Sequence, residues 1–118
     1  MRPILINFQS LEYTQCFFSY KEQIFEKIYK KLRKNLYLLH CVTDYPVDDK
    51  YANLKCIENL SRQLKINVGY SDHTIGNEAA LAAIAMGARV VEKHFTIRND
   101  YSSFRDHQLS ANPDAANQ

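Results

Sequence analysis

The chain has 118 residues, a length typical of one small domain. Its hydrophobic fraction of 46% is enough for a core, and its net charge of +2 lacks the basic excess typical of nucleic-acid-binding proteins. No stretch approaches the roughly 18 apolar residues of a membrane span. Three cysteines without a CxxC pair favour neither a disulfide framework nor a zinc knuckle. These features predict a cytoplasmic protein with no membrane or nucleic-acid partner.

Short apolar runs alternate with helical patterns along the chain. Four strands are predicted, each with a nearly continuous apolar run: 2–8, 36–43, 66–71 and 88–96. Three helices are predicted between them: 20–34, 50–65 and 76–87. This order favours a parallel sheet covered by helices. The tail that follows is polar and turn-rich, with a candidate helix start after Pro113.

Two of the predicted helices leave alternatives open. The helix at 76–87 is rich in alanine, which either lets it lie close against the sheet or reflects the high helix propensity of alanine; both explanations can hold. Asn77 or Thr74 is its expected N-cap, and Gly87 lies where a C′ glycine belongs. The basic segment KIYKKLRKNLY is interpreted as the solvated side of a helix rather than a binding patch.

Polar side chains stand at the predicted carboxyl ends of the last two strands, where parallel α/β proteins place their sites. Ser71 and His73 share a face, and so do Glu92 and His94, because side chains alternate along a strand. Neighbouring strands lie about 4.8 Å apart, so we expect the two imidazoles to converge, with Ser71 and Glu92 one layer deeper. Two such imidazoles suit Mn²⁺ or Zn²⁺; the alternative is a pair of hydrogen-bonded structural histidines.

The other candidate residues carry weaker signals. His40 lies in mid-strand and is expected to be a satisfied core residue, whereas His107 is expected at the surface. Ser71, Asp72 and His73 are contiguous. Adjacent residues on a strand point to opposite faces, so these three cannot form a catalytic triad.

Four segments together resemble the sialic acid synthase family, which comprises the N-acetylneuraminate synthases and their legionaminate and pseudaminate relatives. The segments are HCVTDYP (40–46), VGYSDHTIG (68–76), GARVVEKHFT (87–96) and the RDHQLS…P pattern (105–113). The resemblance implies an α/β fold that is part of a (β/α)₈ TIM barrel. Residues 1–118 would form one domain of about four parallel strands alternating with three helices, the C-terminal half of the barrel. The front half and an antifreeze-like domain would be absent.

The same resemblance implies an activity. Such enzymes condense phosphoenolpyruvate with an open-chain N-acylmannosamine-type sugar, an N-acylated amino sugar, and release phosphate. A divalent metal would take part, with Mn²⁺ foremost and Mg²⁺, Co²⁺ or Zn²⁺ as alternatives. The implied site residues are His73 and His94 for the metal, Ser71 and Thr43 for substrate binding, and Glu92 and Asp106 for acid/base or hydrogen-bonding roles.

The chain also departs from the family pattern. Asn7-Phe8-Gln9-Ser10 stands where the family has serine or threonine followed by glycine, and Phe104-Arg105-Asp106 replaces a Gly-Pro-Asp turn. Half a barrel would expose two sheet edges. We therefore expect an inactive remnant, a partner that completes the barrel (a second copy or a separate front half), or a partial reading of a longer protein. The functional alternatives are a synthase half that is active when completed and a non-catalytic metal-binding or association module.

Overall fold

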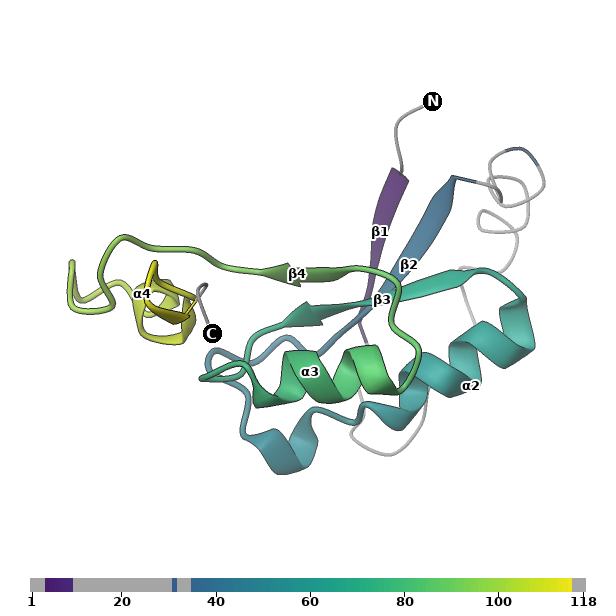
Figure 1. Cartoon of the computed structure of the whole chain (residues 1–118), viewed down its shortest axis with the longest axis horizontal. Coiled ribbons are helices and arrows are strands. Elements are labelled where there is room, and N and C mark those ends of the chain that lie inside the picture. Colours follow the sequence, from purple (N-terminus) through teal and green to yellow (C-terminus); the bar gives the residue numbers. More distant parts are fainter. Residues whose placement is uncertain (1–3, 10–30, 32–34, 116–118) are drawn as a thin grey trace.

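A four-stranded parallel sheet frames the protein (Figure 1). The structure is a computed structural model, and it describes residues 4–9, 31 and 35–115. The strands are β1 (Ile4–Gln9), β2 (Leu36–Cys41), β3 (Asn67–Asp72) and β4 (Val91–Lys93), and they lie in that order across the sheet. The predicted parallel α/β architecture is confirmed for this part of the chain.

The helices of the described residues connect and follow these strands. The connection from β2 to β3 contains a short 3₁₀ helix, η1 (Asp49–Tyr51), and α2 (Lys55–Leu64). Helix α3 (Glu78–Ala85) leads into β4, and α4 (Asp106–Leu109) follows it. Figure 1 shows α2 and α3 side by side on one side of the sheet, with α4 beyond the end of β4. The helix predicted at 20–34 lies outside the described residues, apart from Lys31.

Three predicted boundaries are wrong. The helix predicted at 50–65 is divided between η1 and α2, and Asn53 between them has a left-handed backbone with φ of 48°. The strand predicted at 88–96 keeps ladder pairing only over Val91–Lys93, and Phe95 beyond these residues is 63% exposed. The short helix α4 lies in the tail that was expected to be turn-rich. Its first residue is Asp106.

The core lies between the sheet and the two covering helices. Leu38, Val68 and Tyr70 point from the sheet into this layer because they share one face of their strands. Cys56, Ile57 and Leu60 meet them from α2, and Ala79 and Ala83 from α3. Both of these alanines are at most 8% exposed. Their small side chains let α3 lie close to the sheet, as the alanine-rich pattern predicts.

The end of α3 follows the predicted glycine cap. Gly87 has φ of 97° and donates its N–H to the Ile84 carbonyl, and the next N–H, of Ala88, reaches the Ala83 carbonyl. This pair of bonds is the Schellman arrangement. At the other end, Asn77 is the N-cap residue, but its side chain makes no capping bond and donates to the Ala115 carbonyl instead.

Two further findings concern the cysteines and the helices. Cys41 is a free buried thiol, whereas Cys56 is disulfide-bonded, which the odd cysteine count and the expected reducing setting did not predict.

None of the helices in the described ranges is long and apolar enough to cross a membrane.

Candidate functional site

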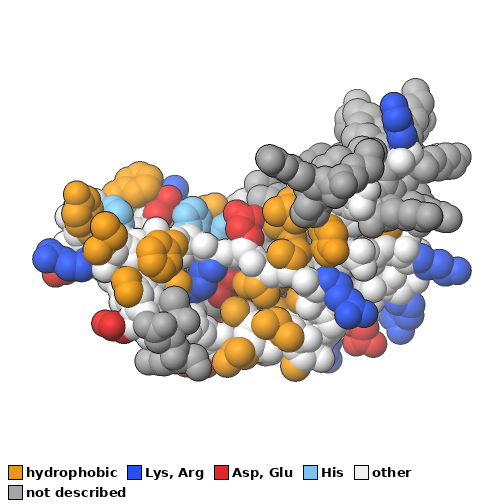
Figure 2. All heavy atoms as spheres, turned by 45° about the horizontal axis from the view of Figure 1, so that its top comes forward, with side chains coloured by type: hydrophobic (Ala, Val, Ile, Leu, Met, Phe, Trp, Pro, Cys, Tyr) orange, Lys and Arg blue, Asp and Glu red, His pale blue; other side chains and the backbone are white. Residues whose placement is uncertain are grey.

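Two histidine rings lie side by side at the carboxyl end of the sheet. His73 follows β3 directly and His94 follows β4 directly. Their ring centroids are 5.5 Å apart and their planes are inclined by 42°. His73 is 5% exposed. The convergence expected from the strand-end pattern is thus present in the structure, and Figure 2 shows histidine and acidic side chains together on the open face toward the end that carries α4.

The backbone fixes the tautomer of His73. Its Nδ1 lies 2.8 Å from the Val42 carbonyl oxygen, which can only accept, so Nδ1 carries the proton and donates. The Cys41 sulfur lies 3.8 Å from the same nitrogen. In the neutral ring Nε2 is then the nitrogen that carries the lone pair, and the Ser71 hydroxyl lies 3.5 Å from it. Histidines that bind metals usually donate their second ring N–H to a carbonyl or carboxylate, and the bond from His73 Nδ1 to Val42 is of this kind.

Tyr45 covers the two rings from the loop after β2. Its ring stacks on His73 with centroids 4.2 Å apart and meets His94 edge-on at 6.0 Å. The Arg105 guanidinium carbon lies 5.3 Å from the Tyr45 ring centroid. Burial raises the pKa of the Tyr45 hydroxyl, and the negative charge of Asp106 is among the further causes. The sequence pattern did not single out Tyr45, although it follows a predicted strand end in HCVTDYP.

One layer deeper, three residues form a row across the strands. Cys41 pairs with Ser71, and Ser71 with Glu92. Ser71 is 2% exposed, whereas Glu92 is exposed. Burial raises the pKa of the Cys41 thiol, and the nearby charge of Glu92 raises it further against the opposing effect of a Ser71 hydrogen bond. The predicted depth of Ser71 and Glu92 below the imidazoles agrees with this register.

The remaining predicted site residues lie at the margin. Asp106 begins α4, and its charge reaches Tyr45, as that of Glu92 does. Thr43 is exposed in the segment that follows β2. The structure therefore gathers Ser71, His73, Glu92 and His94, places Asp106 within electrostatic range of Tyr45, and leaves Thr43 on the open side.

On the opposite side of the same strand ends lies a buried ion pair. Lys93 Nζ is 2.8 Å from Asp72 Oδ2, and the two side chains are 11% and 0% exposed. Asp72 Oδ1 accepts from both the backbone N–H and the hydroxyl of Thr74. The Asp72 carboxylate thus bonds Thr74 and Lys93, not His73. This agrees with the prediction that Ser71, Asp72 and His73 form no triad.

The other two histidines have partners of their own. The Nε2 of His40 lies 2.8 Å from the Ala52 carbonyl, while its buried Nδ1 has no partner among the described residues. The prediction of a core residue is confirmed, but only one nitrogen is satisfied. His107 is half-buried rather than at the surface: its Nδ1 donates to the Thr96 hydroxyl, which in turn donates to the Arg98 carbonyl. His107 therefore anchors the loop before α4.

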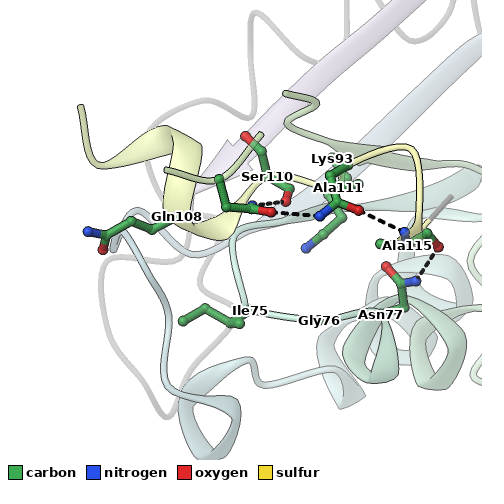
Figure 3. A pocket seen from close by; sticks show the side chains of 10 residues that line it. Ile75, Gly76, Asn77, Lys93, Gln108, Ser110, Ala111 and Ala115 are labelled. Atoms are coloured by element: carbon green, nitrogen blue, oxygen red, sulfur yellow. Dashed lines mark hydrogen bonds between the residues drawn. The ribbon is translucent and has the colours of Figure 1, made fainter. Parts of the chain in front are cut away.

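A cavity of about 180 Å³ adjoins this region, between the start of α3 and the C-terminal segment (Figure 3). Its lining includes Asn77, Asn99 and Asn112. The side-chain amide of Asn112 donates from Nδ2 to the side-chain oxygen Oδ1 of Asn99, and Oδ1 of Asn112 accepts from the Ala115 N–H. These amides are engaged in holding the C-terminal segment against α3.

The donor set at the two rings suits a divalent cation in part. In the ranges that the structure describes, no group of three or more histidine, cysteine or acidic side chains could hold a metal ion. His73 can offer the lone pair of Nε2, because its other ring nitrogen, Nδ1, already donates to the Val42 carbonyl. A cation at these two imidazoles would thus keep several positions for water or substrate, as catalytic metal sites do.

The model of the NeuB family matches residues 17–118. The chain belongs to the NeuB family. Relatives of this NeuB-family chain include the N,N′-diacetyllegionaminic acid synthase of Campylobacter jejuni, 48% identical over 81 residues that cover 69% of this chain and 24% of that protein. The N-acetylneuraminate-9-phosphate synthase of Drosophila melanogaster is 36% identical over 93 residues, which cover 78% of this chain and 25% of that protein. The chain spans about a quarter of the length of these curated relatives.

Solved structures agree with this assignment. The N-acetylneuraminic acid synthetase of Leptospira borgpetersenii, solved in complex with citrate, superposes with a TM-score of 0.77 at 31% identity, covering 96% of this chain and 37% of that one. The spore coat polysaccharide biosynthesis protein SpsE of Bacillus subtilis gives a TM-score of 0.79 at 30% identity, with coverages of 97% and 31%. The family and the parallel α/β fold are thereby shown, and the names of the relatives connect the chain with carbohydrate biosynthesis.

Proposed function

We propose that this chain contributes the metal- and sugar-binding edge of a sialic-acid-type synthase, which joins phosphoenolpyruvate to an N-acylated amino sugar and releases phosphate. The observation that carries the proposal is the pair of neighbouring imidazoles, with the Nε2 lone pair of His73 fixed by the Val42 carbonyl. The names of the relatives, which are synthases of sialic-type acids, support the same reaction class.

In this proposal His73 and His94 hold a divalent cation, Mn²⁺ foremost, with Mg²⁺, Co²⁺ or Zn²⁺ as alternatives. When bound, the cation supplies Lewis-acid polarisation of the sugar aldehyde. The Val42 carbonyl keeps the His73 ring from turning. Tyr45 stacks on the same ring and closes one side of the site against water.

The other site residues have proposed roles toward the two substrates. Ser71 and Thr43 offer hydroxyl groups for the phosphate or carboxylate of phosphoenolpyruvate. As the methylene carbon of phosphoenolpyruvate bonds to the aldehyde carbon, the aldehyde oxygen takes up a proton and becomes a hydroxyl group. One water molecule is consumed as phosphate leaves, and the former enol carbon becomes a keto group. To Glu92 and Asp106 we assign the delivery or uptake of that proton.

The sheet itself implies a partner. A parallel sheet of four strands fits part of a barrel, and β1 and β4 are its edges. Leu5 on β1 is 48% exposed. A second copy of the chain or a separate front half would pair these edges, which an isolated sheet leaves open. The non-catalytic alternative is that the chain binds a metal or a partner without turnover.

Phosphate release tests the proposal. The purified chain is incubated with Mn²⁺, phosphoenolpyruvate and N-acetylmannosamine, alone and together with the front half of a relative. Release above background that is lost in His94→Ala supports the synthase function. Arg62→Ala is the control, because Arg62 is exposed on α2, bonds Asn59 of the same helix and lies outside the proposed set. Mn²⁺ binding without any phosphate release in either mixture supports the non-catalytic alternative.

A further inference from the structure

Each of the two histidines is tied by its backbone to a different neighbour. The register of β3 and β4 ends where Asp72 pairs with Lys93, one residue before His73 and His94. Beyond that point the His73 carbonyl accepts from the Val47 N–H at 2.9 Å, on the β2 side. The His94 carbonyl accepts from the Ala111 N–H at 2.7 Å, on the side of the C-terminal segment. These bonds draw the two histidines toward opposite sides.

One side chain joins the two strands at this point. The Lys93 amine bonds the Asp72 carboxylate and the Thr74 carbonyl, each at 2.8 Å. Asp72 and Thr74 are the residues on either side of His73, and Lys93 is the residue before His94. The Lys93 amine therefore connects the residues before and after His73 to β4. It does so on the face of the sheet opposite the two imidazoles. Asp72 is completely buried and also binds Thr74 through its other oxygen.

The energetics of buried ion pairs favour a geometric role. Taking both charges out of water costs about as much as their attraction returns, and apolar residues of similar shape are often equally stabilising. A contact that adds little net stability still fixes direction, because a charge-assisted hydrogen bond is short and directional. The main effect of this ion pair is therefore to fix the relative position of the carboxyl ends of β3 and β4.

We propose that Asp72 and Lys93 are positioning residues whose ion pair sets the spacing of the His73 and His94 rings. Neither side chain touches substrate or cation. The role in metal binding rests on the proposed function, whereas the spacing of the rings does not.

The test uses Asp72→Asn, Lys93→Met and the double variant of the full chain. Each single variant leaves one buried charge without its partner and should lower the urea midpoint, whereas the double variant should recover most of that loss. The positioning readout is the proton–proton NOE between the two imidazole rings. It should be present in the wild type and in Lys93→Arg, and lost in the double variant. The Mn²⁺ dissociation constant of the double variant should rise roughly tenfold or more.

Asp100→Asn is the control, because it removes a carboxylate from an exposed pair with Arg98. A double variant that keeps the ring NOE and the Mn²⁺ affinity overturns the proposal. A double variant that fails to fold also overturns the proposal, because the ion pair is then a stabilising element. A wild type without the NOE overturns it as well. If the wild type shows the NOE but binds no Mn²⁺, the proposed function fails and the NOE alone decides the positioning role.

Discussion

Gly69 lets β4 approach β3 where the two strands begin to pair, and its replacement by alanine is the sharpest steric test of the structure. A Cβ at this position would lie 2.5 Å from both Cγ1 and the carbonyl oxygen of Val90, and 2.6 Å from Cδ2 of Leu39. Real Cβ atoms essentially never come within 3.0 Å of another heavy atom, so something must move. The Val90 carbonyl cannot withdraw freely, because it accepts the Tyr70 N–H at 2.9 Å.

The cost follows from two contributions. Forcing an extra methyl group into a packed site costs about 2 kcal/mol. Losing the hydrogen bond from Tyr70 to Val90 costs about 1 kcal/mol more. Gly69→Ala should therefore lower the free energy of unfolding by about 3 kcal/mol, a large share of the roughly 5–15 kcal/mol of a small domain. With a urea m value of about 2 kcal/mol/M, the midpoint should fall by about 1.5 M.

Gly87→Ala is the matched control for the same change of one methyl group. Nothing lies within 4 Å of a Cβ at Gly87, so only its φ of 97° opposes the substitution. The expected cost is about 1 kcal/mol. Both variants are measured by urea denaturation followed by circular dichroism. The reasoning is refuted if Gly69→Ala lies within about 0.5 kcal/mol of the wild type or costs no more than Gly87→Ala.

Two further predictions concern the core. Ile57→Ala should cost about 3 kcal/mol in urea denaturation because Ile57 is fully buried, whereas Leu81→Ala, at a residue 65% exposed, should stay within about 0.5 kcal/mol; equal effects would contradict the assignment of the core. Burial lowers the pKa of His40 below its usual 6.5, so the unfolded chain takes up a proton that the folded state resists. The contribution of neutral His40 to the free energy of unfolding should therefore be fully present above about pH 6.5 and be lost as the pH falls below that value. The pH dependence of stability in this range should flatten in His40→Gln. An unchanged slope would show that His40 is not the group responsible.

The sheet order and the two covering helices were predictable because each rests on a strong local pattern. Apolar runs mark β2 and β3, and helical spacing of Ile57, Leu60 and Leu64 marks α2. The convergence of His73 and His94 followed from strand alternation and from the common direction of parallel strands. Both arguments need only neighbours in sequence and a standard strand spacing.

The features that sequence reasoning missed depend on contacts between distant segments. The helical pattern runs unbroken across Asn53, and the tolerance of asparagine for a left-handed backbone is too weak a local signal to predict that it divides the helix. Phe95 continues an apolar run, yet it leaves the ladder to pair with Ala111. Tyr45 reaches His73 only because the loop after β2 turns back over the site. The bond from Lys93 to Thr74 likewise needs the actual paths of both strand ends.

Titration with Mn²⁺ followed by proton NMR tests the central claim most directly. A paramagnetic ion broadens the signals of nearby protons, and the chain carries its own reference in His40, which is buried with its Nε2 bonded to Ala52. We predict that the ring signals of His73 and His94 broaden together and at a lower Mn²⁺ concentration than those of His40, because the effect of the ion falls steeply with distance. Equal broadening of all histidine signals at the same Mn²⁺ concentration, or persistence of the His73 and His94 signals, would contradict a shared cation at these two rings.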